Sequence, residues 1–110
     1  MESEGTTAAT IEPENVDAIP LPSRDHLVGL AVGRMVHYVL PSGPNQGEHR
    51  PAVVVKIWAP GYDTVQLQVF TDGSNDGPEY ASGLHWGTSV SHAPAQAHRW
   101  GSWHWPEYVR

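Results

Sequence analysis

Several short stretches of the chain place apolar residues at every second position, the spacing of a strand with one buried face. The clearest covers residues 64–70, where Val65, Leu67 and Val69 alternate with two glutamines. Residues 51–58 form an almost unbroken apolar run, which predicts a strand covered on both faces. No segment sustains an apolar repeat of about 3.6 residues. We therefore expect five strands, at residues 32–40, 51–58, 64–70, 85–90 and 103–105.

Turn-forming residues separate these stretches. Residues 41–47 and 72–78 are rich in Pro, Gly, Asn and Asp, and the chain holds eleven Gly and ten Pro. Short strands with little room for helix predict an all-β domain that closes its own edges. The expected fold is a small SH3-like β-barrel, with an OB-like fold or a small sandwich as alternatives.

Charge divides the 110-residue chain into two parts. Residues 1–25 carry six acidic residues against Arg24 alone, whereas residues 26–110 carry six acidic and five basic residues. The first part is also poor in large apolar residues and contains three prolines, so it cannot bury enough surface to fold alone. We expect an extended acidic arm over residues 1–25 and a single domain over residues 26–110.

Composition argues against several classes of protein. Without cysteine there are no disulfides and no thiolate metal ligands. No cluster of Lys and Arg is present to neutralise a phosphate backbone, so nucleic acid is not an expected partner. No run approaches the roughly 20 apolar residues of a membrane span, and the first residues lack a signal-peptide pattern. The expectation is a protein made in the cytoplasm that does not bind membranes.

Seven histidines raise the question of a metal site. Four of them recur at spacings of seven, six and six residues, but none forms an HxH or HExxH motif: His85, His92, His98 and His104. Residues 72–77 resemble the start of a calcium loop, yet Gly83 stands where that loop needs its bidentate glutamate. We interpret this segment as a turn, and the histidines as polar residues near the tryptophans. No metal and no cofactor are predicted.

Catalytic patterns are weak. Ser89 precedes His92 and Ser102 precedes His104, but neighbours on a strand diverge, and no nucleophile-elbow motif accompanies them. Two carboxylates, Glu79 and Glu107, converge only if an unknown fold brings them together. Phosphate-binding glycine loops are absent from the sequence. The prediction is a non-catalytic protein.

The final residues concentrate aromatic side chains, with three of the five tryptophans between positions 100 and 105. Trp103 and Trp105 are two residues apart, so on a strand they share a face and His104 points away. The expected core closure consists of Trp58, Trp86, Trp103 and Trp105. The candidate interaction surface consists of Trp100, His104 and Tyr108. The alternative is that the tryptophans form an aromatic platform for a sugar ring, a base or a proline-rich peptide.

Several segments resemble a family of small, uncharacterised proteins encoded by tailed bacteriophages and prophages. The resemblance covers about residues 33–107, and its most specific part is the closing Gly-Ser-Trp-His-Trp-Pro-Glu string at residues 101–107. It is carried by Gly33–Val39, Arg50–Val54, Leu67–Gly73, Asn75–Asp76, Trp86–Val90 and Gly101–Glu107. The family supplies no catalytic residues, so the resemblance implies a context and no chemistry.

A phage context implies two functions. The first is a virion-associated protein, either a capsid decoration protein or a minor structural or tail protein, attached by its arm and the surface of its barrel. Its partners are then other phage structural proteins, such as major capsid or tail subunits, or further copies of itself. The alternative is a host-directed phage protein that binds a small molecule or a host factor in an aromatic pocket.

Overall fold

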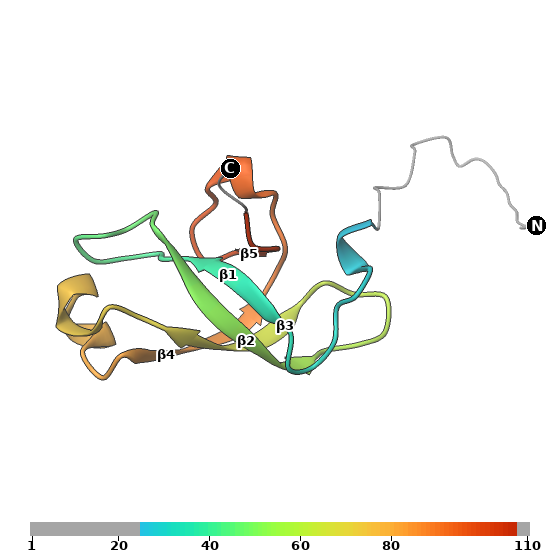
Figure 1. The fold of residues 1–110 in the computed structure, drawn as a ribbon, viewed down its shortest axis with the longest axis horizontal. Helices are drawn as coiled ribbons and strands as arrows, with labels where there is room; N and C mark the ends of the chain where they lie inside the picture. Colours follow the sequence, from blue (N-terminus) through green and yellow to red (C-terminus); the bar gives the residue numbers. More distant parts are fainter. Residues whose placement is uncertain (1–24, 108–110) are drawn as a thin grey trace, which may run out of the picture.

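The computed structural model describes residues 25–107 (Figure 1). Its strands are β1 (Met35–Val39), β2 (His49–Ile57), β3 (Val65–Phe70), β4 (Leu84–Val90) and β5 (Trp103–His104). Short 3₁₀ turns accompany them: η1 (Asp25–Leu27), η2 (Gly73–Asp76), η3 (Pro78–Tyr80) and η4 (Ala95–Ala97). No helix in this part of the chain is long and apolar enough to cross a membrane. The predicted arm lies outside the described residues, apart from Asp25.

All five predicted strands are present, and their bounds differ from the predictions by at most three residues. The strand at residues 65–70 has the predicted alternation, since Val65, Leu67 and Val69 are completely buried. The turn-rich segments form the connections. The prediction of an all-β domain is therefore confirmed for the part of the chain that the structure describes.

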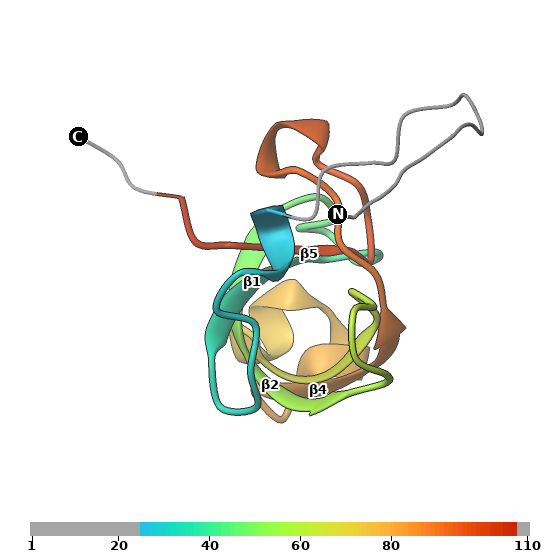
Figure 2. The same ribbon diagram turned by 90° about the vertical axis from the view of Figure 1, so that its right-hand side faces the viewer.

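The strands form one antiparallel sheet in the order β4-β3-β2-β1-β5. Figure 2 shows that this sheet curls strongly around its inner face. The predicted closure into a barrel is wrong, because no ladder joins the two outer strands in the described residues. β5 has two residues, and a single bridge between His92 and Trp103 links it to the segment that follows β4.

The core lies on the concave inner face of the sheet. Its buried side chains come from all five strands, from the residue after β1 and from η3: Val36, Tyr38, Leu40, Ala52, Val54, Val65, Leu67, Val69, Tyr80, Val90 and Trp103. Trp103 is completely buried and donates a hydrogen bond from Nε1 to the carbonyl of Asp63, 2.7 Å away. The shortest strand thus supplies the largest side chain of the core.

Two expectations about the apolar positions are corrected. The apolar run in β2 is not covered on both faces, because Val54 is buried whereas Val55 is 43% exposed. Trp58 and Trp86, expected in the core, are each 49% exposed. The reason is the same in each case: among the described residues no second layer covers the outer face of the sheet, so side chains that point outward meet solvent.

A buried ion pair fixes the loop that contains η2. The carboxylate of Asp76 is completely buried and accepts hydrogen bonds from Arg50 Nε at 2.9 Å and Nη2 at 2.6 Å. It also accepts from Asn45 Nδ2 at 2.8 Å and from the backbone N–H of Asp72 at 2.7 Å. The segment that resembles a calcium loop is therefore a 3₁₀ turn whose last carboxylate points inward to an arginine.

Candidate interaction surface and histidine cluster

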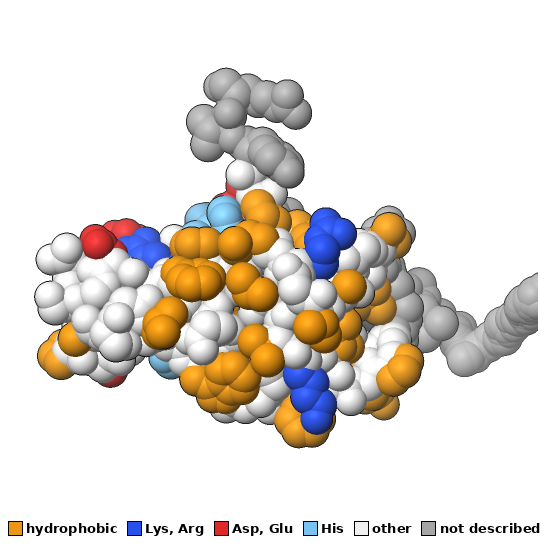
Figure 3. Space-filling model, turned by 60° about the horizontal axis from the view of Figure 1, so that its bottom comes forward, with side chains coloured by type: hydrophobic (Ala, Val, Ile, Leu, Met, Phe, Trp, Pro, Cys, Tyr) orange, Lys and Arg blue, Asp and Glu red, His pale blue; other side chains and the backbone are white. Residues whose placement is uncertain are grey.

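The outer face of the sheet carries a group of apolar side chains that we call the apolar face. Strand register places them in adjacent rows, with Phe70 opposite Leu84, and with Trp86 and Met35 at the two ends of one row. The members are Met35, Pro51, Val53, Phe70, Leu84 and Trp86; the four largest are between 42% and 49% exposed. Figure 3 looks onto this side, where hydrophobic side chains gather below histidines.

One border of the apolar face is polar. A broad, shallow hollow of about 510 Å³ lies there, lined by Glu48, His49, Arg50, Pro51, Phe70, Thr71 and Asp72. Pro51 and Phe70 belong to both features, so the apolar face continues into a rim of charged and polar groups. Apolar centres with polar rims are typical of protein interfaces.

Three imidazoles and a carboxylate converge beside this face, and we call them the histidine cluster: His37, His49, His104 and Glu107. His37 Nδ1 and His104 Nε2 donate to Glu107 Oε1 over 2.7 Å and 2.8 Å. His49 Nδ1 donates to Oε2 of the same carboxylate over 2.8 Å. One carboxylate therefore gathers imidazoles from three strands.

The sheet itself brings these side chains together. His37 on β1 is paired with His104 on β5, and His49 begins β2 opposite Val39. His104 follows the buried Trp103, so the alternation of the strand turns its ring to the outer side. Three adjacent strands thus present their histidines on the same side of the sheet, and Glu107 reaches back to them from three residues beyond His104.

Burial and charge set the protonation states of the cluster. Burial lowers the pKa of His104, whose ring is 2% exposed, although its bond to Glu107 acts in the opposite direction. Burial also opposes ionisation of Glu107, but the hydrogen bonds from His37 and His104 outweigh it and lower the pKa of this carboxyl to about 2. At neutral pH the buried His104 is therefore neutral and Glu107 is ionised.

A second group of titratable residues lies on the other side of β5. His26 Nε2 lies 3.2 Å from a carboxylate oxygen of Asp63, and the rings of His26 and His92 stack with centroids 4.2 Å apart. His92 in turn packs edge-on against Trp103 at 4.8 Å. The two clusters therefore meet neighbouring residues of β5: the second packs against Trp103, and the first contains His104.

The structure separates the residues predicted as the interaction surface. Trp100 is 58% exposed, in keeping with a surface position, and Tyr108 lies outside the described residues. His104 is 2% exposed, so its prediction as a surface residue is wrong. Its ring packs against the rings of His37 and His49, with centroids 5.7 Å and 4.6 Å away, and it donates a hydrogen bond to Glu107.

The two closing tryptophans pack against each other. The rings of Trp103 and Trp105 meet edge to face with centroids 5.5 Å apart. Trp105 is partly buried against the core, donates from Nε1 to the carbonyl of His26 at 2.8 Å, and lies under the guanidinium of Arg34. This pair therefore joins the last strand to the segment that precedes β1.

The residue pairs weighed as catalytic groups have other contacts. Ser102 Oγ donates to the carbonyl of Arg99 at 2.6 Å. Glu79 accepts from Ser42 at 2.7 Å, whereas Glu107 belongs to the histidine cluster. The two carboxylates are thus held by separate networks.

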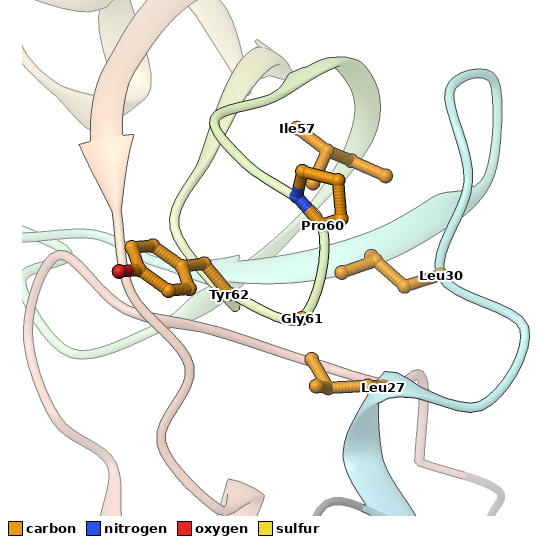
Figure 4. Close-up of a pocket in the computed structure, with 6 residues that line it drawn as sticks. All are labelled: Leu27, Leu30, Ile57, Pro60, Gly61 and Tyr62. Carbon is orange, nitrogen blue, oxygen red and sulfur yellow. The ribbon is translucent and has the colours of Figure 1, made fainter.

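A small apolar hollow lies between η1, the end of β2 and the loop after it (Figure 4). It has a volume of about 170 Å³ and is lined by Leu27, Leu30, Ile57, Pro60, Gly61 and Tyr62. Pockets for small molecules usually span about 300–1,000 Å³ and include polar groups that orient the ligand. This hollow is smaller than that range and contains no tryptophan.

Comparisons of the chain with protein-family models, with curated proteins and with solved structures find no match. The apolar face and the histidine cluster must therefore be interpreted from their own chemistry.

Proposed function

We propose that this protein is a non-catalytic, virion-associated protein of a tailed bacteriophage, either a capsid decoration protein or a minor structural or tail protein. The proposal joins the resemblance in residues 33–107 to the exposed apolar face. We also propose that the fold is related to SH3-like domains. The strand order, with β5 beside β1 and a 3₁₀ turn between β4 and β5, supports this relation.

The observation that carries the proposal is the apolar face itself. Phe70, Leu84 and Trp86 lie close together on β3 and β4 and remain about half exposed. A contiguous group of large apolar side chains with a polar rim marks a site of protein contact. Aromatic residues also contribute strongly to binding at such sites, so Phe70 and Trp86 are the expected anchors.

The partners in this proposal are other phage structural proteins, such as major capsid or tail subunits, or further copies of the chain. The acidic segment before residue 26 would make a second contact. It would act as an arm whose main chain adds a strand to a neighbouring sheet. Repetition over a symmetric particle would turn two modest contacts into durable attachment.

The alternative, a host-directed protein with a ligand in an aromatic pocket, has less support. The apolar hollow is small, and it draws on Tyr62 for its aromatic surface. The apolar face is wide and open, which suits a protein partner better than a small molecule.

The test is to purify phage particles produced from a genome that carries this gene and to detect the protein by quantitative mass spectrometry. The unmodified chain should be present at many copies per particle. The double change Phe70→Ser and Trp86→Ser should reduce incorporation by about tenfold or more, because hot-spot aromatics cost about 2 kcal/mol or more when removed.

Two further variants separate the surfaces. Tyr62→Ser changes a residue that is 63% exposed at the small hollow, and it should leave incorporation unchanged. Removal of residues 1–24 should weaken attachment independently of the double change. Absence of the wild-type protein from purified particles would refute the virion proposal and favour the host-directed alternative.

A further inference from the structure

The histidine cluster brings four possible metal ligands close together, which the proposed contact with a protein partner does not explain. Its four members each offer one ligand atom, and all of these atoms lie within 4.8 Å of one another. The atoms that face the centre are Nδ1 of His37 and His49, Nε2 of His104 and an oxygen of Glu107. These atoms belong to residues of β1, β2 and the segment that begins with β5. Each of these backbone segments positions its own ligand.

Three imidazole nitrogens and one carboxylate oxygen form a donor set that suits a zinc-type ion. Zn²⁺ binds nitrogen at about 2.0–2.1 Å and carboxylate oxygen at about 2.0–2.2 Å, in a tetrahedron. Neighbouring ligand atoms in such a tetrahedron are roughly 3.3 Å apart. In the cluster each imidazole nitrogen lies 2.7–2.8 Å from a Glu107 oxygen, and no two ligand atoms are more than 4.8 Å apart. Side-chain rotations would therefore have to adjust these separations to complete the coordination.

A fourth histidine supports one of the ligands from outside. His49 Nε2 lies 3.1 Å from Nδ1 of His98, so the ring whose Nδ1 faces the cluster also hydrogen-bonds through its other nitrogen. Ligating histidines nearly always have such a partner, because it fixes the ring orientation and the tautomer. His98 adopts a left-handed backbone conformation with φ 46°, which is uncommon for a residue other than glycine.

The burial of the cluster differs from that of a solvated charged surface. The ring of His104 is 2% exposed and that of His49 is 16% exposed, whereas Glu107 is 39% exposed. A metal ligand must be a deprotonated nitrogen, so a bound ion would replace the three hydrogen bonds that the imidazoles donate to Glu107. The partly exposed carboxylate leaves a route by which an ion can enter.

We propose that the histidine cluster binds one divalent transition-metal ion of the Zn²⁺ type. Four protein ligands fill a tetrahedral shell, so the site is structural and carries no catalytic water. The bound ion joins the two-residue strand β5 and the segment after it to β1 and β2. It therefore reinforces the edge of the sheet where the hydrogen-bonded ladder is shortest.

The first experiment is isothermal titration of the untagged full chain with Zn²⁺ after treatment with a chelator. We expect one equivalent to bind with micromolar or tighter affinity. Titration with Co²⁺ should give the visible absorption of a tetrahedral ion, which reports coordination directly.

Variants assign the ion to the cluster. His37→Gln and Glu107→Gln each remove one ligand while keeping a polar group, and each should weaken Zn²⁺ binding on the order of 100-fold or more and abolish the Co²⁺ absorption. His98→Gly suits the positive φ and removes the supporting imidazole, so it should weaken binding about tenfold. Circular dichroism of each metal-free variant verifies that the fold is retained.

Two histidines provide matched controls. His85 packs against Tyr38 and Tyr80, away from both ligand clusters, and His85→Gln should leave Zn²⁺ affinity unchanged. His26→Gln removes a member of the second cluster and should also leave the first equivalent unaffected. The proposal is overturned if wild-type protein binds no stoichiometric Zn²⁺, if binding survives His37→Gln and Glu107→Gln, or if His26→Gln alone abolishes it.

Discussion

Replacing Asp76 with asparagine tests whether the buried ion pair with Arg50 holds the η2 loop against the sheet. The substitution keeps the shape of the side chain and removes its charge. Asp76 is completely buried and accepts two hydrogen bonds from Arg50, one from Asn45 and one from the backbone of Asp72. In the variant, the amide N–H₂ of the asparagine faces an N–H donor instead of accepting from it, and the positive charge of Arg50 loses its partner.

The expected loss of stability follows from these contacts. Removing one partner of a buried pair costs about 3–5 kcal/mol, because the remaining charge is left uncompensated. Arg50 keeps a contact to Glu48 Oε1 at 3.1 Å and is 15% exposed, so solvent and Glu48 relieve part of this cost. We therefore expect Asp76→Asn to lower the free energy of unfolding by about 3 kcal/mol, out of a total of about 5–15 kcal/mol for a small domain.

The loss of stability caused by Asp76→Asn should be smaller at low pH than at neutral pH. The hydrogen bonds from Arg50 hold the pKa of Asp76 well below its ordinary value, despite the opposing effect of burial. A carboxyl with a lowered folded-state pKa stabilises the fold above its unfolded pKa of about 3.9, and this contribution is lost as the pH falls toward the folded pKa. The difference between wild type and variant should therefore be about 1 kcal/mol smaller at pH 3 than at pH 7.

Urea unfolding followed by tryptophan fluorescence measures these free energies at each pH. Glu48→Gln is the matched control, because it removes the exposed partner of the same arginine and should cost less than about 1 kcal/mol. A loss below 1 kcal/mol for Asp76→Asn at pH 7, or a difference that grows on acidification, would refute the reasoning.

Three further predictions concern the core, a turn and the metal. Trp103→Ala should lower the free energy of unfolding by about 3–5 kcal/mol and Trp86→Ala by less than about 1 kcal/mol, in urea titrations. Gly43→Ala should cost about 2 kcal/mol or more in thermal unfolding, because the residue has φ 88° and its Cβ would collide with the carbonyl of Asp76. Zn²⁺ at 100 times its dissociation constant should add about 2.7 kcal/mol, reversed by a chelator and absent in His37→Gln.

The secondary structure could be predicted because its signals are local. Alternation over residues 64–70 shows which side chains of β3 face the core, and glycine and proline clusters mark where strands end. The same alternation places Trp103 and His104 on opposite faces, as the structure has them. Each of these properties depends on residues that are close in sequence.

The face that each apolar residue occupies could not be predicted in the same way. The almost unbroken apolar run of β2 is compatible with two covered faces, and the sequence contains no sign that the outer layer is absent from the described part of the chain. Trp58 and Trp86 are predicted to pack against the closing tryptophans inside, yet each is about half exposed. Large aromatic residues are common both in cores and at interfaces, so residue type does not distinguish the two locations.

The histidine cluster was missed because its members are distant in sequence. His37, His49 and His104 lie on three strands, and their proximity depends on the pairing of β1 with β5. Local spacing shows histidines six or seven residues apart, which is not a metal motif. One signal is present in the sequence: His37 and His104 stand next to aromatic residues, Tyr38 and Trp103, that are buried in the structure. Pairing of the first and last predicted strands would then place the two histidines together on the opposite face.

The apolar face and the histidine cluster share one side of the sheet but use different residues. Met35 and His37 are two positions apart on β1, so both point outward, and the cluster borders the apolar face. Phe70→Ser and Trp86→Ser should then impair attachment to particles without changing Zn²⁺ affinity, and Glu107→Gln should do the reverse. If Glu107→Gln also reduces attachment, the bound ion shapes the edge of the interface. Because each variant is measured for both properties, failure of one proposal leaves the other open to its own test.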